Sequence, residues 1–431
     1  MTEQDCARSE GLLAQMLALH PTEIDLSLDR MHRLLQAMGA PHERLKNVLH
    51  IAGTNGKGST QAYLKAGLRA SGRSVAAYTS PHLVRFHERI ELPDGPIQEP
   101  VLCDVLERTL IANGPHPITY FEATTAAAFL AFAEATPDDV ILEVGLGGRL
   151  DATNVIAKPR LCVITPIDMD HQDFLGDTLN QIAAEKAGIL KAGVPCIVGR
   201  QQDAALDVIE RRAERLGAPL HVLGQHWHAW QEHDRLVFQD ETGLLDLPLP
   251  RLPGRHQIEN AGMALAALRS LGMQEDVCTA AMQTATWPAR MERLRGGALS
   301  GGFAQGELWL DGGHNPAAAQ ALADTLRSLP PRPVHLIVGL QGQKDVDGYL
   351  APLLDIASSL TAVPVPAARG GAADPKALAK RAQEMGCQAG TAPDVHAALA
   401  HLAKEAPEAR VLVCGSLYLA GDVLKAERGH A

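Results

Sequence analysis

The sequence is poor in aromatic residues, has no excess of positive charge and contains no long apolar run. Phe, Trp and Tyr make up only 4% of the 431 residues, which disfavours an all-β sandwich because strands are enriched in aromatic side chains. The formal net charge of -11 at pH 7 disfavours a general binder of nucleic acid or of a membrane surface. No apolar stretch is long enough to span a bilayer. We therefore expect neither nucleic acid nor a membrane as a partner.

Secretion and disulfide signals are also missing. Residues 1–10 carry Glu3, Asp5 and Glu10 and lack the apolar core of a secretion signal. The seven cysteines are scattered, with no Cys-x-x-Cys pair and no spacing typical of a disulfide framework, a pattern typical of reduced intracellular proteins. Hydrophobic residues make up 46% of the chain, which is enough for two cores. The composition therefore predicts a cytoplasmic globular protein with two domains.

From residue 47 onward, short β-rich segments alternate with longer helical ones. The expected strands are residues 47–52, 74–79, 139–144, 160–166, 195–198, 307–311, 334–339 and 410–414. The expected helices are residues 59–70, 123–135, 179–190, 316–328, 347–360 and 375–385. This alternation predicts parallel βαβ units with helices on both faces of a sheet. Residues 220–249 interrupt it with polar–apolar alternation, which predicts a small antiparallel insertion.

Five glycines lie between residues 295 and 306, where the character of the sequence changes. Such a cluster is typical of a hinge or an exposed hairpin at a domain boundary. The strand–helix alternation then starts again. We therefore expect a first domain over residues 1–292 and a second over residues 293–431, with a cleft between them.

The strongest local signal is a glycine-rich turn between an expected strand and an expected helix. It reads Gly53-Thr54-Asn55-Gly56-Lys57-Gly58-Ser59-Thr60. In a P-loop, backbone N–H groups and the helix N-terminus bind phosphate, so Lys57 would add a charge at the β- and γ-phosphates and Ser59 could offer its hydroxyl to Mg²⁺. The spacing differs from the standard P-loop, since Gly58 separates the lysine from the hydroxyl. A plain glycine turn is the alternative interpretation.

This loop resembles that of the Mur ligase and folylpolyglutamate synthase superfamily, and further motifs resemble its folate branch. They follow in order as Tyr78-Thr79-Ser80-Pro81-His82-Leu83, Glu88-Arg89-Ile90, Thr119-Tyr120-Phe121-Glu122, Glu143-Val144-Gly145-Leu146-Gly147-Gly148-Arg149-Leu150-Asp151-Ala152-Thr153-Asn154, Asp170-His171, Leu175-Gly176, Glu185-Lys186-Ala187-Gly188-Ile189, Pro253-Gly254-Arg255-His256-Gln257-Ile258-Glu259-Asn260, Trp287-Pro288-Ala289-Arg290, Asp311-Gly312-Gly313-His314-Asn315-Pro316 and Gly415-Ser416-Leu417. The resemblance implies a two-domain Mur-ligase-like α/β fold. In this fold a P-loop parallel-sheet ATPase domain precedes a smaller Rossmann-like α/β domain.

The resemblance also implies a metal site and catalytic residues. Glu143 ends an apolar strand, so it would lie at the carboxyl edge of the sheet and bind Mg²⁺ together with Ser59. His171 would contribute to a second ion, although Mg²⁺ prefers oxygen ligands, and a structural histidine is the alternative. In related ligases the lysine that matches Lys186 is carbamylated by CO₂ and becomes an anion that supports Mg²⁺; a solvated surface lysine is the alternative. Lys57, His171 and Lys186 are thus the implied catalytic residues.

Four residues resemble the nucleotide contacts of the family. Asn260 suits adenine recognition, while Arg290 and His314 suit the phosphates. Asp311 suits the ribose or the orientation of the arginine. A polar helix residue and a cap are the alternatives for Asn260 and Asp311. Because Arg290 and Asp311 flank the expected boundary, closure of the domains would complete the site.

The implied substrate contacts are Ser80, His82, Arg89, Phe121, Asp151, Leu28, Asp29 and Arg30. Residues 24–30 resemble the region that bifunctional bacterial enzymes use for dihydropteroate, although an amphipathic helix is an alternative. Phe121 could stack on the pterin, and Asp151 could pair with its amino-pyrimidinone edge. A core position for Phe121 and a turn cap for Asp151 are the alternatives.

The implied reaction is ATP-dependent ligation of L-glutamate to 7,8-dihydropteroate and to tetrahydrofolate or folylpolyglutamates, through an acyl phosphate. We expect ATP, a pair of Mg²⁺ ions and a monomeric enzyme. The alternatives are a folylpolyglutamate synthase only, a Mur-type amino-acid ligase and an inactive nucleotide-binding regulator. The Ser80-Pro81-His82 block favours the folate branch, and the intact Lys57 disfavours the regulator.

Overall fold

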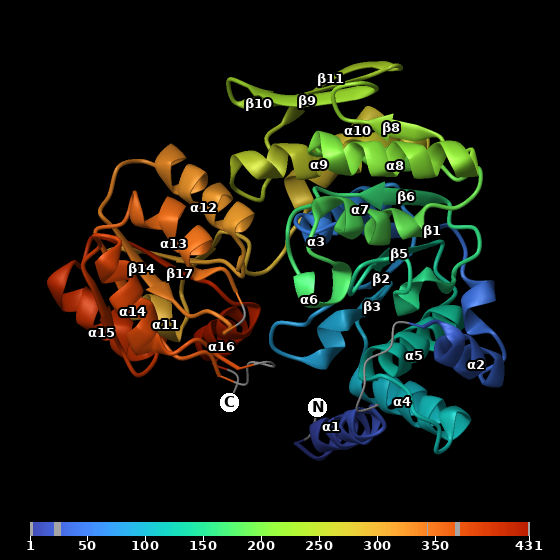
Figure 1. The fold of residues 1–431 in the computed structure, drawn as a ribbon, viewed down its shortest axis with the longest axis horizontal. Coiled ribbons are helices and arrows are strands. Elements are labelled where there is room, and N and C mark those ends of the chain that lie inside the picture. The colour runs from blue at the N-terminus through green and yellow to red at the C-terminus, as the bar shows by residue number, and fades with distance from the viewer. Residues whose placement is uncertain (1–2, 21–26, 343, 367–370, 430–431) are drawn as a thin grey trace. The chain divides into compact units, whose positions relative to one another are not determined.

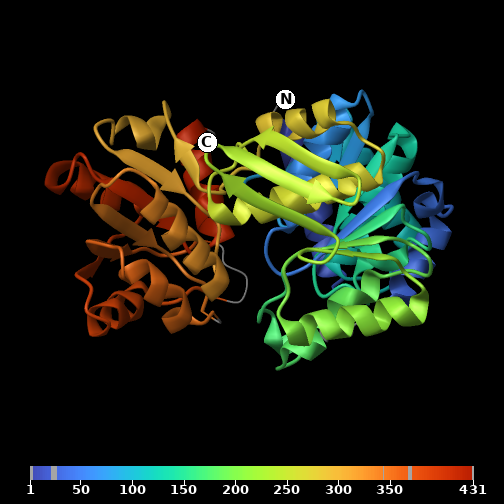
Figure 2. The same ribbon diagram turned by 90° about the horizontal axis from the view of Figure 1, so that it is seen from above.

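The computed structural model describes residues 3–20, 27–342, 344–366 and 371–429, and Figures 1 and 2 show the fold from two directions. The chain forms two compact units. The first consists of Met1–Arg251 and Ile258–Ala285, and the second of Leu252–Gln257 and Thr286–Ala431. Apart from residues 252–257, which belong to the second unit, the units divide between Ala285 and Thr286. The domain limits at residues 292 and 293 stay a prediction.

An eight-stranded sheet forms the centre of the first unit, in the order β4-β3-β2-β5-β1-β6-β7-β8. The strands from β2 to β8 in this order pair in parallel, while β3 and β4 add an antiparallel edge. The strands are β1 Val48–Ala52, β2 Val75–Tyr78, β3 Ile90–Leu92, β4 Gly95–Pro96, β5 Asp139–Glu143, β6 Leu161–Ile164, β7 Cys196–Val198 and β8 Leu220–Val222. The central strands are buried along their whole length, which is why they are continuous apolar runs in the sequence.

Helices cover both faces of this sheet, as the alternation predicts. Val48 and Leu142 pack into one core with Phe129. Leu49 and Ile51 point to the opposite face and are also fully buried. The helices of the unit are α1 Glu3–Ala18, α2 Asp29–Ala37, α3 Lys57–Ala70, α4 Glu99–Asn113, α5 Tyr120–Ala135, α6 Gln172–Leu175, α7 Leu179–Lys186, α8 Asp203–Leu216 and α10 Glu275–Thr284, with the 3-10 turns η1 Pro41–Arg44, η2 Phe86–Arg89, η3 Ala152–Val155 and η4 Ala187–Ile189.

A small antiparallel sheet follows β8 and confirms most of the predicted insertion. It contains β9 Trp227–Glu232, β10 Arg235–Asp240 and β11 Gly243–Pro248 in the order β11-β10-β9. The start of the predicted range is different, because β8 pairs in parallel with β7 and extends the large sheet. A Cβ atom on Gly262 would lie 2.7 Å from both Trp227 and Ala229, so the small sheet packs closely on α9 Arg255–Ser270 (Figure 1).

The second unit is built around a six-stranded sheet in the order β12-β13-β17-β14-β15-β16. Only β12 pairs antiparallel among these strands, and β17 lies between β13 and β14. The strands are β12 Glu292–Leu294, β13 Glu307–Leu310, β14 Val334–Val338, β15 Ser359–Ala362, β16 Ala389–Thr391 and β17 Arg410–Cys414. The helices are α11 Ala298–Gly301, α12 Pro316–Ser328, α13 Val346–Leu354, α14 Pro375–Glu384, α15 Val395–Glu405 and α16 Leu417–Arg428.

The predicted helix over residues 347–360 is wrong in its second half. Helix α13 ends at Leu354, and β15 begins at Ser359. Leu360 is 1% exposed, because β15 pairs in parallel with β14 inside the sheet. Pairing within the sheet therefore outweighs the helical pattern of this stretch.

The glycine-rich stretch at residues 295–306 connects β12 and β13 inside the second unit and contains α11. The Glu427 carboxylate, on α16, accepts hydrogen bonds from the backbone N–H groups of Gly297, Leu299 and Ser300. A carboxylate at the N-terminus of a short helix satisfies N–H groups that have no acceptor inside the helix. The stretch is thus a tethered connection between two paired strands.

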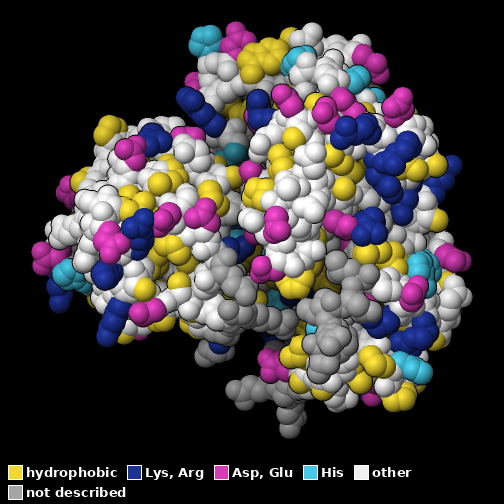
Figure 3. Space-filling model, viewed as in Figure 1, with side chains coloured by type: hydrophobic (Ala, Val, Ile, Leu, Met, Phe, Trp, Pro, Cys, Tyr) yellow, Lys and Arg dark blue, Asp and Glu magenta, His cyan; other side chains and the backbone are white. Residues whose placement is uncertain are grey.

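None of the helices in the described ranges combines the length and apolarity that a bilayer crossing needs. On the face shown in Figure 3, positive and negative side chains are interspersed over each unit. Mixed charge of this kind is typical of a solvated protein surface.

Candidate active site

The glycine-rich loop joins β1 to α3 at the carboxyl edge of the large sheet. Gly53 has a φ of +146° and Gly56 a φ of +87°. A Cβ atom on Gly53 would overlap Thr165, and one on Gly56 would overlap the side-chain oxygen of Asn260. The loop therefore needs glycine at both positions, for the backbone angle and for the close neighbours.

The segment that follows β6 holds the loop from one side. The N–H groups of Thr54 and Asn55 both donate to the carbonyl of Pro166, at 2.9 and 3.3 Å. The Thr54 hydroxyl also exchanges hydrogen bonds with the backbone of Asp168. These N–H groups are thus engaged within the protein. The first N–H groups of any α-helix lack an acceptor within the helix, and α3 begins at Lys57, directly after the loop.

Two lysine amines converge on one carbonyl of the loop. Lys57 Nζ donates to Gly53 O at 3.0 Å and to Thr54 O at 3.2 Å. Lys186 Nζ donates to the same Gly53 O at 3.0 Å. Lys186 is only 5% exposed, and its burial, reinforced by the charge of Lys57, lowers its pKa from the ordinary 10.5 to about 7. The surface-lysine alternative for Lys186 is therefore wrong.

The oxygen donors expected for Mg²⁺ lie in this region. Glu143 ends β5 and pairs in register with Ile51 of β1, directly before the loop. Glu143 is 6% exposed and Ser59 2%. A hydroxyl and a carboxylate are ligands that Mg²⁺ accepts, and Mg²⁺ keeps several waters. The residues present therefore fit the ion without a full protein cage.

His171 lies beside Asp170, at the start of α6. It has a φ of +54°, and its side chain is 48% exposed. The backbone N–H of His171 donates to Asp170 Oδ1 at 2.9 Å, and its ring atom Nε2 lies 3.9 Å from Asp170 Oδ2. Within the described residues, no group of three or more His, Cys, Asp and Glu side chains is spaced to hold a metal ion. A second ion at His171 stays a prediction.

Asp151 closes the loop that follows Glu143. Its Oδ2 accepts from the N–H groups of Gly145 and Leu146, at 3.0 and 2.9 Å. Its Oδ1 accepts from the N–H and the hydroxyl of Thr153, at 3.0 and 2.5 Å. Burial raises the pKa of the Asp151 carboxyl, and these hydrogen bonds oppose the rise. The cap that the sequence left open is thus present, and a contact with a pterin stays a prediction.

Phe121 lies against the same loop, at the start of α5. A Cβ atom on Gly145 would overlap its ring, and the ring of Tyr78 is 6.0 Å away between centroids. The Thr119 hydroxyl and the Glu122 carboxylate cap this end of α5 reciprocally. Phe121 is half-buried, and its ring lies beside Gly145. It therefore packs partly in the core, as the alternative interpretation has it, and is partly exposed.

The other expected substrate residues lie in two segments of the first unit. Ser80 precedes Pro81 through a cis peptide bond, and His82 Nδ1 accepts from Arg89 Nε at 2.9 Å. In the second segment, residues 24–26 lie outside the described residues. Leu28 packs on the core that contains α5, and Asp29 is exposed. The structure thus orders the first segment and residues 27–30 of the second. A further link is the ion pair from Arg30 Nε to Glu122 Oε2, at 3.0 Å.

Three of the four expected nucleotide residues meet in the second unit. Asp311 Oδ2 accepts from Met291 N at 2.8 Å, and Asp311 Oδ1 accepts from Gly313 N at 2.6 Å. Arg290 Nη1 donates to Ala289 O at 2.9 Å. His314 Nδ1 lies 3.1 Å from the carbonyl of Gly312. The fourth, Asn260, lies beside Gly56 in the first unit.

Sequence reasoning missed the residues that support these loops. Thr165, Pro166 and Asp168 hold the glycine-rich loop, and their position after an apolar strand was the available signal. It also missed His256, which is half-buried and is influenced by the charges of Asp311 and Arg290; desolvation of its ring lowers its pKa.

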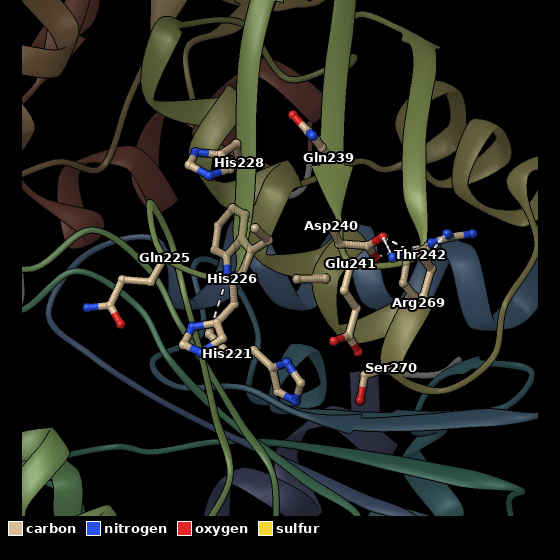
Figure 4. Close-up of a pocket in the computed structure, with 12 residues that line it drawn as sticks. His221, Gln225, His226, His228, Gln239, Asp240, Glu241, Thr242, Arg269 and Ser270 are labelled. Atoms are coloured by element: carbon tan, nitrogen blue, oxygen red, sulfur yellow. Dashed lines mark hydrogen bonds and ion pairs between the residues drawn. The ribbon is translucent and has the colours of Figure 1, made fainter.

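A cavity of about 580 Å³ lies where the small antiparallel sheet meets the end of α9 (Figure 4). Its lining includes His221, His226, His228, Asp240 and Arg269. Several of these groups bind one another or the backbone. Arg269 Nε donates to Asp240 Oδ2 at 3.3 Å, and His226 Nδ1 accepts from a backbone N–H at 3.1 Å. We therefore assign no ligand to this cavity.

Known proteins match the whole chain. The family of the Mur ligase middle domain matches residues 51–268, and that of the dihydrofolate synthetase C-terminal domain matches residues 303–426. The chain is 34% identical over 433 residues to dihydrofolate synthase/folylpolyglutamate synthase of Escherichia coli, covering 98% of this chain and 96% of that protein.

Solved structures share the fold. Escherichia coli FolC in complex with DHPP and ADP matches with a TM-score of 0.87 at 33% identity, over 98% of both chains. A bifunctional folylpolyglutamate synthase/dihydrofolate synthase from Yersinia pestis, complexed with AMPPNP and Mn ion, matches with a TM-score of 0.87 at 32% identity, over 99% of both chains. The Mur-ligase-like α/β fold expected from the sequence is confirmed.

Proposed function

The chain belongs to the family of dihydrofolate synthases and folylpolyglutamate synthases, among the Mur ligases, and from this premise we propose that it is an ATP-dependent ligase that joins L-glutamate to 7,8-dihydropteroate and to tetrahydrofolate or its polyglutamates. The observation that carries this proposal is the convergence of Lys57 and Lys186 on Gly53 O, next to the strand that ends in Glu143. The Escherichia coli relative is named for both activities, which supports the bifunctional form. We further propose a monomeric, cytoplasmic enzyme with domains at residues 1–292 and 293–431.

The first task of the chain is to hold the phosphates of ATP. A lysine ammonium has three donors, and two of those of Lys57 are used on Gly53 O and Thr54 O. The third remains for a phosphate oxygen, beside the N–H groups at the start of α3. Ser59 and Glu143 would hold Mg²⁺, which supplies positive charge to the β- and γ-phosphates when bound. The other loop residues expected to contact the nucleotide are proposed to shape this phosphate site. They are Gly53, Thr54, Asn55, Gly56, Gly58 and Thr60.

The second task is to bring the reactants together. The carboxylate of the pteroate or folate attacks the γ-phosphorus of ATP, the bond to the bridging β–γ oxygen breaks, and an acyl phosphate forms as ADP leaves. The amine of glutamate then attacks the acyl carbon, a tetrahedral intermediate forms, and inorganic phosphate leaves. Positioning and charge stabilisation account for most of the catalysis in such reactions. Phe121 is proposed to stack on the pterin, and Asp151 to contact it at the end of the loop.

Nucleotide and acceptor contacts complete the proposal. Asn260 would contact the adenine, and Arg290 and His314 the phosphates, while Asp311 keeps the backbone beside Arg290 in place. The acceptor would also meet the residues of the two ordered segments. These are Ser80, His82, Arg89, Leu28, Asp29 and Arg30.

Lys186 is proposed to react with CO₂. Only a neutral amine reacts, and with a pKa of about 7 a large fraction of Lys186 is neutral at physiological pH. The charge of Lys57 disfavours a second ammonium, but it favours the carbamate anion. The carbamate, with His171, is proposed to support a second Mg²⁺. Native mass measurement with and without bicarbonate tests the adduct, and Lys186→Ala with added small carboxylic acids tests its role. No added mass and no rescue would contradict carbamylation.

The function is tested by phosphate release with ATP, Mg²⁺ and L-glutamate, together with product masses. We expect a glutamate mass on both 7,8-dihydropteroate and tetrahydrofolate, and no product without an acceptor. Addition to tetrahydrofolate alone would make the protein a folylpolyglutamate synthase only. Addition to neither would remove the folate assignment and leave a Mur-type ligase for another acid as the alternative.

A further inference from the structure

A buried chain of hydrogen bonds runs from the middle of β1 to the loop after Glu143. His50 Nε2 lies 2.8 Å from Thr153 Oγ1, and Thr153 Oγ1 lies 2.5 Å from Asp151 Oδ1. Asp151 Oδ2 then accepts from Gly145 N and Leu146 N. His50 and Thr153 are fully buried and Asp151 is 5% exposed. The proposed mechanism uses Asp151 but gives no role to the two residues behind it.

The direction of each hydrogen bond in this chain follows from the partners. Asp151 receives two hydrogen bonds on each oxygen, from three backbone N–H groups and one hydroxyl, as an ionised carboxylate does. The hydroxyl of Thr153 has one proton, and this proton points to Asp151. Thr153 must therefore accept from His50, so the imidazole proton lies on Nε2. His50 Nδ1, which is buried and has no hydrogen-bond partner among the residues that the structure describes, carries no proton.

A histidine at this position of β1 is expected to lower the stability of the fold. Its neighbours in the sheet are Leu142 of β5 and Cys162 of β6, and the strand is buried over its whole length. A buried polar nitrogen without a partner destabilises a protein, and an apolar side chain here would avoid that cost. Within the described part of the chain, the hydroxyl of Thr153 is the hydrogen-bond partner of the imidazole. The geometry therefore indicates that His50 is present because it fixes the orientation of that hydroxyl.

We propose that His50 and Thr153 are positioning residues for the acceptor, because they fix the orientation of the Asp151 carboxylate and of the loop at Gly145 on which Phe121 lies. Neither residue touches substrate. The inference rests on the proposed function, since Asp151 and Phe121 are assigned to the pterin there. The glycine-rich loop proposed to hold ATP is tied instead to Pro166, in the segment after β6. Loss of these hydrogen bonds should therefore weaken binding of the acceptor and leave binding of ATP unchanged.

Thr153→Val and Thr153→Ser form the matched pair that tests this. Valine keeps the shape and removes the hydroxyl, whereas serine keeps the hydroxyl. We expect Thr153→Val to raise KM for 7,8-dihydropteroate roughly tenfold, the effect of one lost hydrogen bond to a charged group, with KM for ATP unchanged and with recovery in Thr153→Ser. His50→Leu should behave like Thr153→Val, and His50→Gln, whose amide can still donate, should resemble the parent. Unchanged acceptor KM in Thr153→Val, or an equal rise for ATP, would overturn the inference.

Nitrogen-15 NMR of the histidines in the parent protein gives a second test that needs no variant of Thr153. At pH 7 we expect one buried imidazole with its proton on Nε2, assigned to His50 by its loss in His50→Gln. A proton on Nδ1 would contradict the hydrogen-bond directions assigned to His50, Thr153 and Asp151. The two proposals fail separately: a protein that adds glutamate to neither acceptor removes the proposed function, whereas an active protein with an unperturbed Thr153→Val removes only this inference.

Discussion

At the carboxyl edge of each sheet an acidic residue ends or follows a strand, but the two acidic residues make different contacts. In the second unit β13 is followed by Asp311, whose own two oxygens accept the N–H groups of Met291 and Gly313. In the first unit β5 ends in Glu143, but the following N–H groups of Gly145 and Leu146 are accepted by Asp151. A second carboxylate thus shapes the loop after Glu143. The comparison teaches that a strand-end carboxylate can serve a ligand when another residue shapes its loop.

The largest expected effect comes from Glu143→Gln, which keeps the shape and removes the charge. If Glu143 serves Mg²⁺ and not its loop, turnover should fall by about 10²–10³-fold, with the free energy of unfolding nearly unchanged. Product formation against Mg²⁺ concentration and urea unfolding measure the two quantities. A Glu143→Gln protein with normal turnover and reduced stability would break the comparison.

The opposite result is expected for Asp311→Ala. The change leaves the N–H groups of Met291 and Gly313 without their acceptor, so the free energy of unfolding should fall by about 3 kcal/mol. Asp345→Ala is the control, because Asp345 caps α13 through Gly348 N at an exposed position and should cost only about 1 kcal/mol. Urea unfolding of both variants decides. Equal losses would mean that Asp311 is an ordinary cap.

Gly56→Ala sharpens the comparison by testing the loop of the first unit itself. Gly72 has nearly the same φ, +81° against +87° for Gly56, but a Cβ atom there meets nothing within 4 Å. Both variants should lose about 1–2 kcal/mol from backbone strain. Only Gly56→Ala displaces Asn260, so only this variant should also raise KM for ATP, by roughly tenfold. Equal KM values in both variants would contradict a role for this contact.

A further effect is a pH dependence of stability at Lys186. The folded protein holds this proton with a pKa of about 7, against 10.5 ordinarily, so between these values the unfolded chain binds more protons. Stability therefore rises with pH in this window, by up to about 1.4 kcal/mol per unit, and the cost of the buried charge is fully present below pH 7. Lys186→Met lacks this cost. Its stability advantage, from urea unfolding in CO₂-free buffer, should shrink from pH 6.5 to 9.

A constant advantage across that range would mean that Lys186 keeps its proton in the folded protein. The second sheet edge offers no counterpart among its described residues, since its expected nucleotide residues include no buried lysine. The experiment thus isolates what is particular to the first edge.

The sequence predicts the parallel core and the phosphate loop well, because both depend on local patterns. Buried parallel strands such as β5 and β6 are continuous apolar runs, and a P-loop needs a strand, glycines, a lysine and a helix in order. The helix predicted over residues 347–360 fails at Leu360, because a neighbouring strand decides the state of this segment. Local propensity carries no information about that neighbour.

The site is predictable in its residues but not in its contacts. Lys186 Nζ reaches Gly53 O across 133 positions of sequence, and only the fold brings them together. For Asp151 the sequence leaves a cap and a ligand contact open, and the four hydrogen bonds were needed to establish the cap. The role of His50 is hidden for the same reason, since Thr153 lies 103 positions away.

The position of β17 has a consequence for protein synthesis. This strand pairs with both β13 and β14, yet the ribosome releases β13, β14, β15 and β16 before it. At about 5–20 residues per second, the nascent second unit waits for several seconds with two buried-type strands open at their edges. Direct pairing of β13 with β14 would bury similar apolar surface in the wrong order. We therefore expect the yield of this protein to depend on translation speed and chaperone access over residues 311–410.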